Sequence, residues 1–117
     1  MKTSWPLRIA AALGFLGVAL GAFGAHALKA KLASFGYTAT WETAVFYQLV
    51  HAVALAALAA ADRASRLLAI LWIAGVAIFS GSLYVLCLTD IKALGAITPI
   101  GGLLLLAGWV VLAIRGR

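Results

Sequence analysis

The chain has 117 residues, of which 66% are hydrophobic and 10% are charged, and its formal net charge is +6. A soluble domain is about half apolar and about a quarter charged, and so small a domain has too little interior to bury this excess, which excludes a soluble globular protein. The basic residues lie between and beside the apolar runs, where they suit anionic lipid headgroups. We therefore expect membrane lipids as partners and no binding of nucleic acid.

Four apolar runs follow one another along the chain. They cover residues 7–27, 41–61, 67–88 and 97–114. Each is close to the ~20 residues that cross a hydrocarbon core of ~30 Å at ~1.5 Å per residue. The sequence thus predicts an all-α fold, a four-helix transmembrane bundle that forms one domain over residues 1–117.

The first run has a second interpretation. Lys2 and Arg8 are followed by an apolar stretch, and residues 25–27 read Ala-His-Ala, so the segment resembles a secretory signal peptide with its cleavage site. The apolar run is longer than the usual hydrophobic part of a signal peptide. We therefore expect it to be a retained spanning helix.

Small residues form one strip of this first helix. The strip consists of Gly14, Gly17, Gly21 and Gly24. Small residues on one ribbon let another helix approach closely, so the strip predicts a tight helix contact, within the monomer or in a homo-oligomer. The alternative is an ordinary glycine-rich membrane helix.

The connectors predict the topology. In residues 28–40, Leu28, Leu32 and Phe35 share one helical face, which predicts a short helix in the membrane interface between the first two spans. Residues 62–66 and 89–95 are too short for anything but links between antiparallel helices. Six of the nine basic residues then share one side of the membrane: Lys2, Arg8, Arg63, Arg66, Arg115 and Arg117. The positive-inside rule places that side, with both termini, in the cytoplasm. We expect the protein to lie in the plasma (bacterial inner) membrane.

Polar side chains interrupt the second and third runs. Tyr47, Gln48 and His51 lie on one helical stripe, and Ser80 and Tyr84 on another. Such groups are costly in lipid and need partners or a purpose. His51 lies ~15 Å below the start of its run. The predicted polar pocket, in the outer half of the bundle, comprises His26, Glu42, Tyr47, Gln48, His51, Ser80, Tyr84 and Thr98.

Two interpretations of these polar residues stay open. In one, they line a recess that opens outward, where Glu42 and His51 bind a ligand or relay protons. In the other, they hydrogen-bond one another and lock the bundle. One haem held by both histidines is disfavoured, because His26 lies near the outer end and His51 near mid-membrane. We expect no cofactor, no metal site and no catalytic residue, because no ligand spacing and no nucleophile–base motif is present.

Four ordered blocks of sequence resemble a known family. They are GAFGAHALK at residues 21–29, ETAVFYQLVHA at 42–52, FSGSLYVL at 79–86 and LGAITPIGGL at 94–103. The chain resembles the YgdD/YwdK family of small membrane proteins, known as domain of unknown function 423 and similar to eukaryotic transmembrane protein 256. The resemblance implies an integral membrane protein with about four helices, and it implies no reaction, substrate or cofactor. The connector over residues 33–41 departs from the charged, often acidic linker associated with the family.

These observations favour a small non-enzymatic membrane protein. We expect a structural or accessory component that engages lipids or other membrane proteins. The alternatives are a small transporter or channel that uses the outward-opening polar recess, and a redox or haem-handling accessory.

Overall fold

The computed structural model describes residues 4–115 of the chain, and the described residues form six helical segments. They are α1 (Trp5–Ala25), α2 (Lys29–Phe35), α3 (Thr38–Ala60), α4 (Arg66–Thr89), the 3₁₀ helix η1 (Lys92–Ala96) and α5 (Thr98–Arg115). Four helices are long and apolar enough to cross a membrane. The expected all-α fold, with four spanning helices and a short helix between the first two, is confirmed. Lys2 and Arg117, used in the charge argument, lie outside the described residues.

Local sequence signals set several helix ends. Ser4 and Ser65 cap α1 and α4, because each hydroxyl accepts a hydrogen bond from the backbone N–H three residues later, at 3.3 and 3.2 Å. Gly36 ends α2 in the left-handed conformation, with φ of 76°, which glycine adopts without steric cost. Asp90 ends α4 with φ of 58°, a conformation that Asp tolerates better than most residues.

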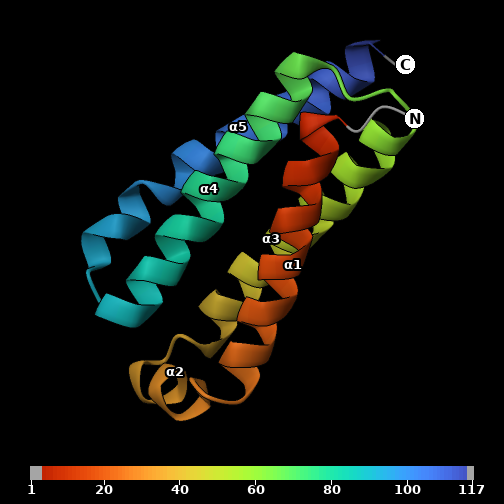
Figure 1. Cartoon of the computed structure of the whole chain (residues 1–117). Helices are drawn as coiled ribbons and strands as arrows, with labels where there is room; N and C mark the ends of the chain where they lie inside the picture. Colours follow the sequence, from red (N-terminus) through yellow and green to blue (C-terminus); the bar gives the residue numbers. More distant parts are fainter. Residues whose placement is uncertain (1–3, 116–117) are drawn as a thin grey trace.

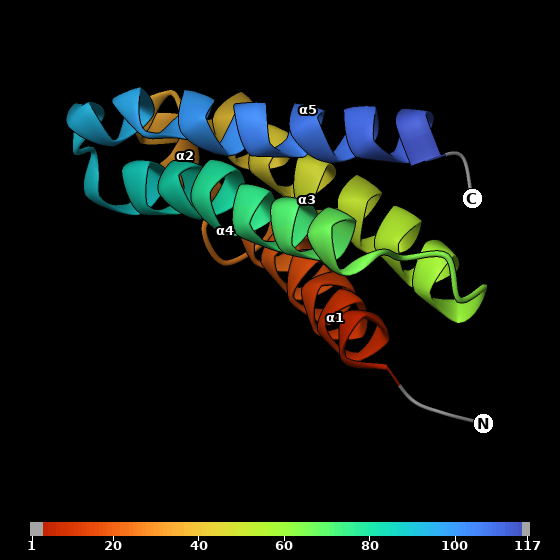
Figure 2. The ribbon, with the colours of Figure 1, turned by 90° about the horizontal axis from the view of Figure 1, so that it is seen from above.

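The spanning helices lie side by side in the order α1, α3, α4, α5, each packed on its neighbours in this row. Figure 1 shows the start of α1, the end of α5 and the α3–α4 turn at one end of the molecule, and α2 at the other. This is the grouping of loops that the charge argument assumes. Figure 2 shows α4 and α5 running alongside each other, while α1 diverges from them toward its N-terminal end.

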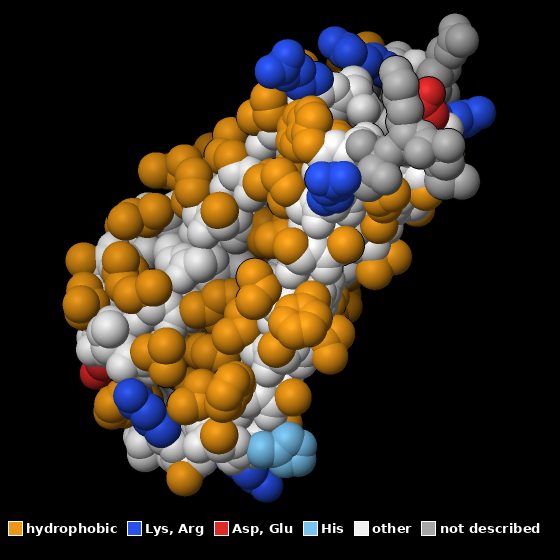
Figure 3. Space-filling model, viewed as in Figure 1, with side chains coloured by type: hydrophobic (Ala, Val, Ile, Leu, Met, Phe, Trp, Pro, Cys, Tyr) orange, Lys and Arg blue, Asp and Glu red, His pale blue; other side chains and the backbone are white. Residues whose placement is uncertain are grey.

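The molecule is a flattened slab of 46 × 28 × 17 Å. Its long axis matches the ~40–45 Å of a bilayer with its headgroup regions. Figure 3, viewed as Figure 1, shows hydrophobic side chains over the middle of the molecule and Lys and Arg side chains gathered at its two ends. Phe15 and Leu103 are 74% and 66% exposed, as lipid-facing side chains would be. The surface therefore has the charge and hydropathy pattern of a membrane-spanning protein.

The glycine strip of α1 packs on α3. A Cβ added at Gly17 would lie 2.6 Å from the side chain of Leu49, and one at Gly24 would overlap the indole of Trp41. Gly21 is less crowded, with Val45 at 3.3 Å. Gly14 departs from the expectation, because an added Cβ there would meet no atom within 4 Å. The strip therefore packs closely on α3 within the monomer at Gly17, Gly21 and Gly24, and Gly14 lies outside this contact.

A second small-residue contact joins α4 and α5. A Cβ added at Gly101 would overlap the backbone of Phe79, and one at Gly108 would overlap the indole of Trp72. Gly75 on α4 faces Leu105 in the same interface. Because the two backbones approach this closely, their helices pack along most of their length.

Candidate functional site

Gln48 is the centre of the buried polar groups. Its side chain is 3% exposed. Its Nε2 donates to the backbone carbonyl of Leu13 on α1 at 2.8 Å, and its Oε1 accepts from the Tyr84 hydroxyl on α4 at 2.6 Å. One amide thus ties three spanning helices together.

Two further side chains of this region bond to backbone carbonyls across helix interfaces. The Ser80 hydroxyl on α4 donates to the carbonyl of Ala44 on α3 at 2.7 Å. The indole N–H of Trp41 on α3 donates to the carbonyl of Leu20 on α1 at 2.9 Å. In each case the acceptor belongs to a neighbouring helix, so the bond fixes the relative height of the two helices.

His51 lies in a cage of aromatic rings and bonds through both ring nitrogens. Its Nδ1 is 2.8 Å from the Tyr47 carbonyl, and the Trp109 indole N–H donates to its Nε2 at 3.0 Å. Indole only donates and a carbonyl only accepts. The network therefore assigns His51 as neutral, with its proton on Nδ1. The Trp72 ring, whose centroid is 5.4 Å away, packs edge-on against the imidazole.

Helices α4 and α5 share two polar contacts of their own. The Ser82 and Thr98 hydroxyls are 2.6 Å apart, and the Trp72 indole N–H donates to the Leu105 carbonyl at 3.1 Å. Within residues 4–115, every buried side-chain nitrogen or oxygen has a hydrogen-bond partner. The buried polar side chains are thus engaged by other protein groups.

Three of the sequence-predicted residues lie away from this network or at its edge. His26 is exposed at the end of α1, beside a shallow depression formed with Phe23. Glu42 is exposed on α3 and lines a groove on a different face. Tyr47 is 40% exposed, and its ring centroid is 4.6 Å from that of Phe79. The predicted set therefore includes a connected core and separate surface positions, and it does not converge on one pocket.

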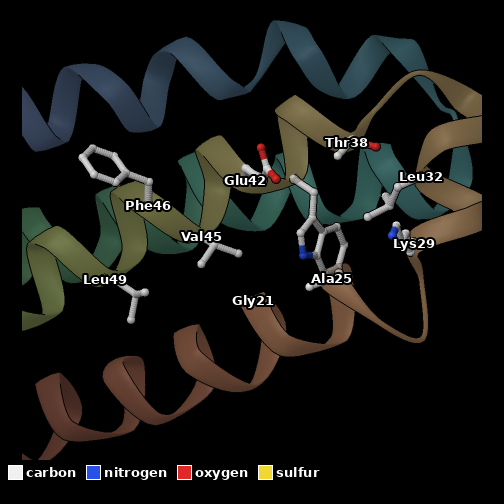
Figure 4. Close-up of a pocket in the computed structure, with 11 residues that line it drawn as sticks. Gly21, Ala25, Lys29, Leu32, Thr38, Glu42, Val45, Phe46 and Leu49 are labelled. Atoms are coloured by element: carbon white, nitrogen blue, oxygen red, sulfur yellow. The ribbon is translucent and has the colours of Figure 1, made fainter.

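The groove lies between α1, α2 and α3 and has a cavity volume of about 490 Å³. This volume is within the range of about 300–1,000 Å³ that is usual for small-molecule sites. Figure 4 shows Lys29 on α2 and Glu42 on α3 among the residues that line it. Its position along the chain placed Glu42 in the outer half of the bundle, but no sequence pattern connected it with Lys29. The available signal was the small-residue strip of α1, which forms one wall through Gly21.

A surface cluster at the same end joins two loops. The Tyr37 hydroxyl donates a hydrogen bond to Asp90, and Lys92 forms an ion pair with Asp90 at 3.1 Å. The bond to Asp90 raises the pKa of Tyr37. The bonds from Tyr37 and then Lys92 lower the pKa of Asp90, and the bond to Asp90 raises the pKa of Lys92. These contacts hold the α2–α3 and α4–η1 connections together.

Side chains of the types that bind metal ions are dispersed over the described residues. Among the described residues, no three His, Cys, Asp or Glu side chains come together as ligands for a metal ion. Cys87 is buried and unoxidised, and it packs with Leu32 and Trp41. Its environment is that of a small apolar residue.

Comparison with known proteins identifies the family. The profile of a family described as "Protein of unknown function (DUF423)" matches residues 20–102. A UPF0382 membrane protein of Staphylococcus haemolyticus is 47% identical over 85% of this chain and 84% of its own length. The UPF0382 membrane protein YwdK of Bacillus subtilis is 42% identical over 85% of each chain, and one of Haemophilus influenzae is 40% identical over 97% of this chain and 93% of its own length. No solved structure matches the chain. The resemblance seen in the sequence is thereby confirmed, and the chain belongs to the DUF423 family of membrane proteins.

Proposed function

We propose that the protein is a non-catalytic accessory component of the membrane, which presents fixed outer surfaces to lipids or to other membrane proteins. The observation that carries this proposal is the state of the buried polar groups. Each buried side-chain nitrogen or oxygen in residues 4–115 bonds within the protein. A path for ions or polar solutes needs such groups to face a cavity instead.

The side chains with chemical capacity support the same proposal. Ser80 and His51 each donate to a backbone carbonyl, and Tyr84 donates to an amide oxygen. Nucleophilic catalysis requires a nucleophile within hydrogen-bond reach of a base. The bonds that these groups make are structural, since each joins two helices or two turns of one helix.

The haem-handling alternative has less support. An axial ligand must offer an unoccupied ring nitrogen to the iron. In His51 one ring nitrogen bonds to Tyr47 and the other to Trp109. An absorbance spectrum of the purified protein tests this alternative directly, because a Soret band would support it.

A flux measurement tests the proposal against a transporter or channel. The full chain is reconstituted in liposomes that contain a pH-sensitive dye, and proton and potassium gradients are imposed. We expect leak rates equal to those of protein-free liposomes. A flux that His51→Phe abolishes would refute the proposal, provided that His26→Phe, which changes the exposed histidine, leaves the flux unchanged.

A further inference from the structure

The groove between α1, α2 and α3 has a charged end and an apolar end. Lys29 begins α2, and Thr38 begins α3, so both lie at the end of the molecule where α2 is found. Glu42 follows one turn into α3. Val45 and Leu49 line the groove ~5 and ~10 Å farther along α3 than Glu42. The polarity of the groove therefore changes in the direction in which a bilayer changes from headgroups to acyl chains.

The walls of the groove are fixed by contacts already described. Gly21 and Gly24 of α1 line one side of the groove, where they pack against Val45 and Trp41 of α3. Trp41 forms part of the wall, and its indole is held by the Leu20 carbonyl at 2.9 Å. The opposite edge includes Phe46, which is 63% exposed. A ligand would thus meet a preformed groove between α1, α2 and α3 whose lining is mostly apolar (Figure 4).

Both charges of the groove are available to a ligand. Among the described residues, the ion pair between Lys92 and Asp90 is the one salt bridge, so neither Lys29 nor Glu42 has an opposite charge within 4.0 Å. The groove is therefore lined by an ammonium group from α2 and a carboxylate from α3, neither of which is paired with an opposite charge. An occupant that complements it carries one negative group and one hydrogen-bonding cation next to an acyl chain.

We propose that this groove binds a phospholipid whose headgroup contains both a phosphate and a primary ammonium, as in phosphatidylethanolamine. Lys29 contacts the phosphate, Glu42 accepts hydrogen bonds from the ammonium, and an acyl chain lies along Val45 and Leu49. This assignment rests on the proposed accessory function and names the lipid that the protein engages. The glycerol hydroxyls of phosphatidylglycerol can donate to the carboxylate of Glu42, but they carry no positive charge to strengthen the bond. The quaternary ammonium of phosphatidylcholine has no N–H to donate to Glu42.

Native mass spectrometry of the detergent-solubilised full chain tests the assignment. Phosphatidylethanolamine, phosphatidylcholine and phosphatidylglycerol with identical acyl chains are added at equal concentration. We expect phosphatidylethanolamine to bind about tenfold more tightly than the other two, as one added charge-assisted hydrogen bond would give. Glu42→Gln removes this preference and leaves phosphatidylcholine binding unchanged. Lys29→Gln weakens the binding of all three lipids.

Matched controls separate the groove from general surface charge. Lys31→Gln removes a positive charge from the same helix α2, and Asp62→Asn removes a carboxylate from the opposite end of the molecule; neither residue lines the groove. Both variants are expected to bind like the wild type. Equal binding of the three lipids by the wild type, or an unchanged preference in Glu42→Gln, would overturn the assignment.

The outcomes also distinguish this assignment from the function on which it rests. If the wild type shows no headgroup preference and no flux in liposomes, the assignment of the lipid is wrong and the accessory function still stands. Flux that depends on His51 refutes the accessory function whatever the lipid preference. Ala25→Trp provides a second test, because it places a large ring in the groove. Far-UV circular dichroism checks that the variant is folded. If it is, its selectivity for phosphatidylethanolamine must fall, and retained selectivity would place the lipid elsewhere.

Discussion

The bond between Gln48 and Tyr84 provides a quantitative test of the polar core. Gln48→Leu removes two inter-helix hydrogen bonds, one to Leu13 and one from Tyr84. Side-chain hydrogen bonds in membrane proteins contribute about 0.6 kcal/mol on average and at most about 1.7 kcal/mol. Both bonds here are short and at least partly buried, so we expect about 1 kcal/mol for each and about 2 kcal/mol of destabilisation for Gln48→Leu. Tyr84→Phe removes one of the two bonds and is expected to cost about 1 kcal/mol.

A double-mutant cycle isolates the shared bond. The double variant is expected to lose about 2 kcal/mol rather than the sum of about 3, because the single changes remove the same bond. Unfolding in mixed micelles of increasing dodecyl sulfate content, followed by circular dichroism, measures these free energies. Thr43→Val is the control, since its hydroxyl bonds only within α3 and is exposed. If the two single effects add to within about 0.3–0.5 kcal/mol, the bond contributes nothing and the interpretation of the core is wrong.

Three more predictions concern helix packing, pH and topology. Gly101→Ala is expected to cost about 1–3 kcal/mol, because the added Cβ would overlap a backbone on α4, whereas Gly81→Ala, with nothing within 4 Å, is expected to be neutral or stabilising by up to about 1 kcal/mol in the same unfolding assay. The pKa of Asp90 is below its ordinary value of 3.8, so the stability it contributes is present above that value and is lost as the pH falls through the folded pKa. The unfolding temperatures of the wild type and Asp90→Asn should therefore differ at neutral pH and converge in acid, and a constant difference down to pH ~2 would contradict this. Finally, Lys31→Cys in intact cells should react with a membrane-impermeant maleimide and Arg63→Cys should not; the reverse pattern would place both termini outside.

The spans were predictable because they depend on one local quantity, the length of an apolar run. The ends of the helices α1, α3, α4 and α5 differ from those of the expected apolar runs by at most three residues, at the start of α3, which begins at residue 38 and not 41. The stripe on α3 was predictable for a similar reason, since helical periodicity puts Gln48 and His51 on one face. Both side chains are buried in the protein, at 3% and 5% exposure. Gln48 and Tyr84 were placed in one polar group from sequence, but only the structure shows that they are bonded to each other.

Depth alone did not determine which residues meet. The rise along a helix gives the height of Glu42, Thr98 and His26, but the direction each faces depends on the order of the helices in the row. Thr98 bonds to Ser82 across the α4–α5 interface, while Glu42 and His26 face outward. No local pattern indicates that order, because all four spans have similar hydropathy.

The partner of His51 was missed for the same reason. Trp109 is 41% exposed, and from sequence it resembles a lipid-facing aromatic residue. Only the placement of α5 beside α4 brings its indole to His51. The contact at Gly101 was also missed, because glycines after Pro99 suit a helix start. The spacing from Gly101 to Gly108 was the signal for a second small-residue interface.

Most inter-helix side-chain hydrogen bonds join neighbours in the row of helices, and the bond from Trp109 to His51 joins α5 to α3. Lipid gives helices little hydrophobic reason to associate, so close packing and polar bonds must select their register. Each neighbouring pair of spanning helices is joined by two side-chain hydrogen bonds. The side chains are Trp41 and Gln48 for α1–α3, Ser80 and Tyr84 for α3–α4, and Trp72 and Ser82 for α4–α5. Four of the six end on backbone carbonyls, which are present at every height of a helix. The interior therefore commits its polar atoms to joining the helices. The charged side chains that remain for recognition lie at the membrane surface, and Lys29 and Glu42 are the two that share a groove.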